Sequence, residues 1–165
     1  MSSLAPRPQP ILLARGEAVD LDDVMTVMRA AFSPDFGEAW TRSQCAGILP
    51  MSGVAMILAR DPATHEPLGF SLLRTVADEA ELLLVAVVPP ARERGIGAAL
   101  VDHFVTYSRG WGATRLHLEV RDANTALALY QRSGFEIAGR RHNYYQGPGG
   151  VQYDALTLVL QSPQD

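Results

Sequence analysis

The chain has 165 residues, of which 47% are apolar and 19% charged, a composition typical of one globular domain rather than a disordered or collagen-like chain. Its formal net charge of −4 argues against a protein that coats nucleic acid, because that role needs a basic face. The only cysteine, Cys45, excludes an internal disulfide and fits a reducing compartment.

The sequence lacks the apolar segments that a spanning helix or a secretion signal requires. No run reaches about 18 apolar residues, and residues 1–10 carry three prolines in place of an apolar signal core. We therefore expect a flexible lead-in over residues 1–10 and a single cytoplasmic domain over residues 11–161, with neither a membrane nor nucleic acid as partner.

The first half of the chain combines helical and strand-like patterns. Apolar residues at helical spacing predict helices over residues 20–32 and 38–49. Strand-like runs, separated by turn-forming residues, cover residues 11–15, 53–60, 68–76 and 81–88.

The second half continues in the same mixed order. A helix is predicted from Gly95 to about residues 110–112, followed by an alternating strand over residues 115–120. Residues 124–132 predict a helix that Ser133 and Gly134 close. Two further strands are predicted over residues 135–141 and 153–160. The whole order predicts a mixed α/β fold with helices set between strands.

The segment Arg92-Glu93-Arg94-Gly95-Ile96-Gly97 joins an apolar strand to an amphipathic helix. The start of that helix would offer unpaired N–H donors and a positive dipole end to a phosphate. The chain contains no lysine, which excludes a P-loop, and Leu100 stands where a dinucleotide fingerprint needs its third glycine. A phosphate-binding loop and a simple tight turn both remain compatible with this pattern.

Two longer segments carry a family resemblance. Residues 87–104, VVPPARERGIGAALVDHF, resemble the acetyl-CoA-binding motif of the GNAT superfamily of N-acetyltransferases, and residues 118–141 resemble the segment that follows it. The motifs DEAELLLVAV, LEVR, NTALALY, GF and NYY are similar to those of RimI-like enzymes, which acetylate the N-terminal alanine of a small-subunit ribosomal protein. The resemblance implies an α/β (mixed α+β) GNAT fold, with a mostly antiparallel sheet of about seven strands flanked by about four helices.

The resemblance also implies acetyl-CoA as cosubstrate and a protein N-terminus as acceptor. The residues that would hold the coenzyme are Val85, Ala86, Val87, Arg92, Glu93, Arg94, Gly95, Ile96, Gly97, Ala98 and Asn124. Asn124 would also cap the helix that it precedes. No metal is expected, because the four histidines show no ligand spacing.

In the resembled enzymes a general base occupies the position of Glu119 and a general acid that of Tyr130. Strand alternation places Glu119 on the face opposite Leu118 and Val120. A thiol with a pKa near 8.5 would take its proton from a phenol near 10, uphill by about 2 kcal/mol. A solvated Glu119 and a core-packed Tyr130 are the alternatives.

The resemblance places the acceptor between residues 32–40 and 143–153, with Trp40, Tyr144 and Tyr145 as contacts. One departure concerns the last strand, where Tyr153-Asp154-Ala155 replaces the family's common Glu-Asp-Ala. Acetylation of a small amine and a non-catalytic acyl-CoA sensor are the competing interpretations.

Overall fold

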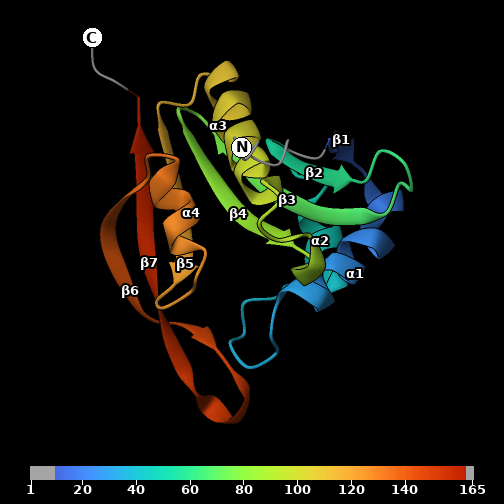
Figure 1. Ribbon diagram of the computed structural model, residues 1–165. Coiled ribbons are helices and arrows are strands. Elements are labelled where there is room, and N and C mark those ends of the chain that lie inside the picture. The colour runs from blue at the N-terminus through green and yellow to red at the C-terminus, as the bar shows by residue number, and fades with distance from the viewer. Residues whose placement is uncertain (1–9, 163–165) are drawn as a thin grey trace, which may run out of the picture.

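A computed structural model describes residues 10–162, and its seven strands form one sheet in the order β1-β2-β3-β4-β5-β7-β6 (Figure 1). All neighbouring strands are antiparallel except β4 and β5, which are parallel. The strands are β1 (Leu12–Gly16), β2 (Val54–Arg60), β3 (Pro67–Val76), β4 (Glu79–Val87), β5 (Arg115–Arg121), β6 (Glu136–Gln146) and β7 (Gln152–Gln161). Most of the predicted lead-in, residues 1–9, lies outside the described residues.

Helices cover both faces of this sheet (Figure 1). They are α1 (Leu21–Ala31), α2 (Arg42–Ile48), α3 (Ile96–Gly110) and α4 (Leu127–Arg132), with 3-10 turns η1 (Ala18–Asp20), η2 (Pro89–Ala91) and η3 (Pro148–Gly150). Phe70 of β3 belongs to the apolar cluster that includes residues of α1 and α2. Leu73 lies on the opposite face of the sheet, in the cluster that contains Phe104 of α3. The mixed α/β fold with a mostly antiparallel sheet is thereby confirmed. Within residues 10–162, no helix has the length and apolar character to span a membrane.

Two predicted helix starts are wrong. The second helix begins at Arg42 instead of residue 38, because the Thr41 hydroxyl accepts from the Gln44 N–H while the Gln44 side chain accepts from the Thr41 N–H. The last helix begins at Leu127 instead of residue 124. Asn124 does not cap this helix, contrary to the expectation. It forms a turn ahead of the helix, with its side-chain oxygen accepting a hydrogen bond from the Ala126 N–H at 2.8 Å.

The final hairpin is longer than predicted, because β6 continues past residue 141 to Gln146. Its register shifts between Arg141 and Tyr145, and Asn143 adopts a left-handed φ of 56°. The Asp154 carboxylate accepts a hydrogen bond from the Asn143 N–H at 3.0 Å and so fixes this bulge.

The centre of the sheet opens where its two parallel strands part. β4 pairs with β5 only from Glu79 to Leu82, opposite Arg115 to Leu118. Beyond this point β4 keeps only β3 as its neighbour, and β5 keeps only β7. Within residues 10–162, the inner edges of both strands are consequently left without a strand partner. This opening positions the site.

Candidate active site

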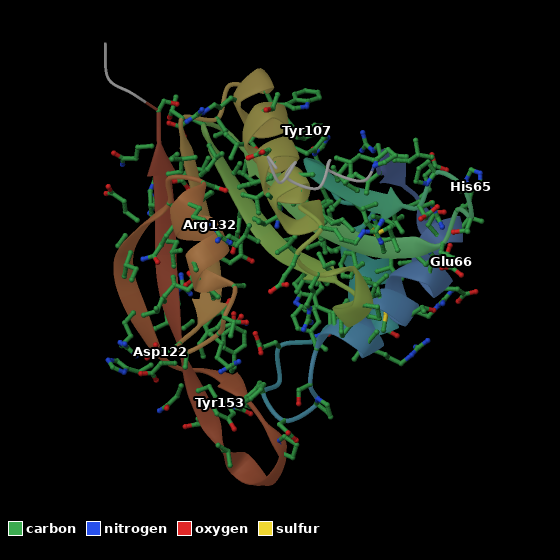
Figure 2. All side chains as sticks on the ribbon, in the orientation of Figure 1. His65, Glu66, Tyr107, Asp122, Arg132 and Tyr153 are labelled. Atoms are coloured by element: carbon green, nitrogen blue, oxygen red, sulfur yellow. The ribbon has the colours of Figure 1, made fainter. Side chains whose placement is uncertain are left out.

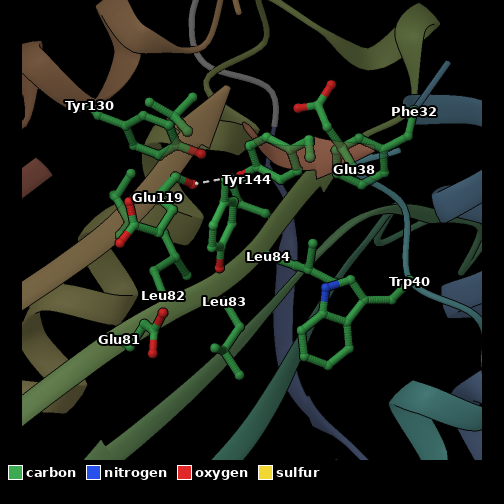
Figure 3. Close-up of a pocket in the computed structure, with 14 residues that line it drawn as sticks. Phe32, Glu38, Trp40, Glu81, Leu82, Leu83, Leu84, Glu119, Tyr130 and Tyr144 are labelled. Atoms are coloured by element: carbon green, nitrogen blue, oxygen red, sulfur yellow. Dashed lines mark hydrogen bonds between the residues drawn. The ribbon is translucent and has the colours of Figure 1, made fainter. Parts of the chain in front are cut away.

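A pocket lies where β4 and β5 part (Figure 3). Side chains reach it from the loop after α1 and from β4, β5, α4 and β6. It is lined by Phe32, Glu38, Trp40, Glu81, Leu82, Leu83, Leu84, Val85, Leu118, Glu119, Val120, Tyr130, Tyr144 and Tyr145. The structure therefore brings together both predicted catalytic residues and all three predicted acceptor contacts.

Glu119 is held in the pocket by two side chains that sequence reasoning missed. Its side chain is only 8% exposed. The Thr157 hydroxyl donates to one carboxylate oxygen at 2.7 Å, and Arg141 Nε lies 3.1 Å from the other. This environment excludes an ordinary solvated glutamate, because the carboxylate is buried and its orientation is fixed.

Tyr130 has an apolar end and a polar end. Its ring packs in the core, edge-on to Phe135 at 6.4 Å between centroids. Its hydroxyl faces the pocket and makes no hydrogen bond to any group within residues 10–162 (Figure 3). Burial, and secondarily the Glu38 carboxylate, raises the pKa of Tyr130 above its ordinary value. The phenol therefore stays protonated at neutral pH, and its gap to a thiol is wider than the sequence suggested.

Glu38 is the main pocket residue that was not predicted. One of its carboxylate oxygens accepts from Arg121 Nε at 2.9 Å, and the other accepts from Asn124 Nδ2 at 2.8 Å. The Glu38 and Arg121 side chains are 10% and 12% exposed, and the guanidinium lies 3.7 Å from the centroid of the Phe36 ring. These contacts fasten the loop after α1 to the ends of β5 and α4.

The same loop also packs against the final hairpin (Figure 2). The Phe36 and Tyr153 rings meet edge to face at 5.3 Å. The backbones approach so closely that a Cβ on Gly37 would lie 1.9 Å from the Gln146 carbonyl oxygen. Gly37 also has a φ of 69°, so both its conformation and its surroundings require glycine.

The two predicted tyrosines of β6 line the pocket from the hairpin side. Their rings are perpendicular at 4.9 Å, and the Tyr145 hydroxyl donates to the Glu119 carbonyl oxygen at 3.4 Å. Burial raises the pKa of Tyr145, with a further contribution from Tyr144. Burial also raises the pKa of Tyr144, as do the nearby Glu119 and Glu81 carboxylates. Both hydroxyls remain protonated donors at neutral pH.

The loop before α3 presents backbone N–H groups. Glu93 and Gly95 have left-handed φ values of 66° and 81°, and α3 begins at the next residue. The N–H groups of residues 96–98 have no backbone acceptor within residues 10–162. A Cβ on Gly97 would lie 3.0 Å from the end of the Leu129 side chain of α4, so a larger residue would require that side chain to shift.

A profile of the Acetyltransferase (GNAT) family matches residues 21–135, more than half of the chain. This chain belongs to the GNAT family. It is 32% identical over 145 residues to ribosomal protein bS18-alanine N-acetyltransferase of Salmonella typhimurium, covering 82% of this chain and 97% of that protein. The Haemophilus influenzae protein of the same name is 28% identical over 143 residues, covering 82% and 98%. The crystal structure of the Escherichia coli ribosomal-protein-S18-alanine N-acetyltransferase superposes with a TM-score of 0.81 at 27% identity, covering 94% of this chain and 96% of that structure.

The chain is therefore a GNAT acetyltransferase, an enzyme of a family that uses acetyl-CoA, and its residues suit that cosubstrate. The unpaired N–H groups in the first turn of α3 fit a pyrophosphate, and the buried Arg94 Nε lacks a hydrogen-bond partner within residues 10–162. The unpaired inner edge of β4 at Val85, Ala86 and Val87 fits an extended amide-containing arm.

Two of the residues expected to hold the coenzyme, Arg92 and Asn124, already bind other groups of the protein. The exposed Arg92 donates to the carbonyls of Val87 and Ala31 at 3.3 Å and 2.9 Å, so it joins α1 to the loop before α3. The Asn124 side chain is already bonded to Glu38 and Ala126.

Proposed function

We propose that this enzyme transfers the acetyl group of acetyl-CoA to the N-terminal α-amine of a protein, with the N-terminal alanine of a small-subunit ribosomal protein as the leading acceptor. The observation that carries this proposal is that one pocket, where β4 and β5 part, is lined by both predicted catalytic groups. One is the buried, oriented Glu119 carboxylate, and the other is the Tyr130 hydroxyl, which has no hydrogen-bond partner within residues 10–162. The names and coverage of the relatives support the acceptor class.

Glu119 acts as the general base. An α-amino group has a pKa of about 7.7 to 8.0, so about a tenth or more is already neutral at pH 7 and the base has a modest task. Thr157 and Arg141 hold the carboxylate in one orientation. It therefore accepts the ammonium proton directly or through one water, and the freed nitrogen lone pair attacks the thioester carbonyl.

Tyr130 acts on the leaving sulfur. As the new N–C bond forms and the C–S bond breaks, its hydroxyl donates a hydrogen bond and then its proton to the thiolate. The ordinary gap between phenol and thiol is about 2 kcal/mol, and the raised pKa of Tyr130 widens it. Hydrogen bonding to the developing charge consequently supplies more of the stabilisation than early proton transfer does.

Backbone groups bind the coenzyme, and side chains bind the acceptor. Backbone N–H groups of the loop over residues 92–98 bind the pyrophosphate, and the inner edge of residues 85–87 bonds the pantetheine arm and the acetyl carbonyl. Trp40, Tyr144 and Tyr145 line the opposite side of the pocket, where the peptide N-terminus binds.

The test is release of coenzyme A from acetyl-CoA with three acceptors: a synthetic Ala-Arg peptide, the same peptide with a blocked amine, and a panel of small amines. Turnover on the free peptide alone, with mass spectrometry placing the acetyl group on its α-amine, is expected. Turnover on small amines alone would contradict the proposed acceptor while retaining the acetyltransferase.

A further inference from the structure

Three carboxylates from the part of the chain that the structure describes line the pocket, and only one of them has no partner there. Glu38 binds Arg121 and Asn124, and Glu119 binds Thr157 and Arg141. Glu81 lines the same pocket but makes neither a hydrogen bond nor an ion pair with any group within residues 10–162. Its two carboxylate oxygens are therefore available to a group that enters from outside.

Glu81 belongs to the next-to-last residue pair before β4 and β5 part. It stands opposite His117 in the parallel register, so it shares a sheet face with Glu119, two residues further along β5. That step corresponds to about 6.5 Å along the strand. Figure 3 shows Glu81, Glu119 and Tyr144 around the same part of the pocket. Arg74, the neighbour of Glu81 in β3, forms no ion pair with it.

The chemistry of this position favours a cation on the acceptor. A carboxylate in a partly dry pocket attracts positive charge more strongly than one in open water. The reacting amine approaches Glu119, and a long cationic side chain near that amine spans the distance to Glu81. We propose that Glu81 is a specificity-determining residue that binds an Arg or Lys side chain next to the acetylated N-terminus. This inference rests on the proposed N-terminal acetylation and narrows its substrate class.

The test compares two peptides that differ only in charge, Ala-Arg and Ala-citrulline, through kcat/KM. The wild type is expected to prefer the Arg peptide about fivefold, the upper range for a partly exposed ion pair. Glu81→Gln removes that preference through KM, and Glu81→Asp retains part of it.

Glu79→Gln is the matched control. It removes the same charge from the same strand, but Glu79 lies outside the pocket and pairs with Arg115 at 3.4 Å. The Glu79→Gln variant keeps the preference. Coenzyme binding and thermal melting check that each variant is folded.

Three results would overturn the role of Glu81: a preference that survives Glu81→Gln, a preference lost equally in Glu79→Gln, or an equal fall of kcat on both peptides. Acetylation of small amines alone would reject the protein acceptor separately. The dication putrescine and the monocation butylamine then replace the peptides, and loss of a putrescine preference in Glu81→Gln would retain the cation-binding role. A chain that acetylates neither class would overturn both proposals.

Discussion

The two ends of the site, the start of α3 and the pocket between β4 and β5, are formed by different kinds of groups. The first turn of α3 presents backbone N–H groups from one short stretch, whereas the pocket is built from side chains of five separate segments. A surface of backbone groups tolerates changes in its side chains as long as the chain path is kept. A surface of converging side chains depends on each contact that orients them, so substitutions should separate the two ends.

The largest effect is expected at Glu119. Glu119→Gln keeps the shape of the side chain but cannot accept a proton, so kcat falls by about 10²- to 10⁴-fold. Coenzyme binding, which relies on the other end of the site, stays unchanged in calorimetry. Glu136→Gln on the exposed face of β6 is the control. A normal kcat in Glu119→Gln would remove the base assignment.

The next effect concerns the buried pair of Glu38 and Arg121. Glu38→Ala leaves the guanidinium without its carboxylate and is expected to cost about 3 kcal/mol in the free energy of unfolding. The double variant with Arg121→Ala should lose less than the sum of the single variants. Urea unfolding measures all three.

The pair of Arg42 and Asp22 provides the comparison for that cycle. Their side chains are 54% and 85% exposed, so Arg42→Ala should cost below about 1 kcal/mol. If the losses in the free energy of unfolding of Glu38→Ala and Arg121→Ala simply add in the double variant, the ion pair does not hold the loop after α1 in place.

A smaller effect is expected when the loop after α1 is displaced from the hairpin of β6 and β7, namely an increase of about tenfold in the KM for the peptide. Gly37→Ala places a Cβ 1.9 Å from the Gln146 carbonyl oxygen. Gly149→Ala is the control, because Gly149 has a similar φ of 72° but a Cβ there would meet no atom within 4 Å. Equal effects of the two substitutions would indicate backbone strain instead of loop displacement. The KM for acetyl-CoA should change in neither variant.

The smallest effect is expected at Asp154. The Asn143 N–H and then Arg140 lower the pKa of this carboxyl, so its contribution to stability is present above its ordinary pKa of about 3.9 and is lost as the pH falls through the lowered value. Asp154→Asn should reduce the drop in Tm between pH 6 and pH 3, and lower kcat a few-fold by loosening the bulge before Tyr144. An unchanged drop in Tm would exclude this linkage.

The difference between the two ends also explains what the sequence could predict. Alternation along residues 115–120 placed Glu119 on the correct face, because that strand has one buried and one polar side. Gly95 and Gly97 stand within one short segment at the start of α3, so the turn and the helix start could be predicted from the sequence. The start of α2 was readable too, since Thr41 and Gln44 form a capping box, but the apolar spacing outweighed it.

Other features depend on contacts that no local pattern contains. Glu38 and Arg121 are 83 residues apart, and only the folded sheet brings them together. The length of β6 was underestimated because nearly all of its residues are exposed, so the strand carries no period of buried side chains. Its pairing with β7 is what defines it.

The parting of β4 and β5 has a consequence for the resistance of the folded protein to aggregation. Most sheets keep unpaired strand edges at their rims, where they are short or covered, because such edges are templates for aggregation. Here two edges face each other in the interior of the sheet. A molecule that fills the opening and pairs with them acts as a missing strand and, by mass action, adds to the free energy of unfolding. We therefore expect the resistance of the folded protein to unfolding and aggregation to rise with the concentration of a molecule that binds in this opening.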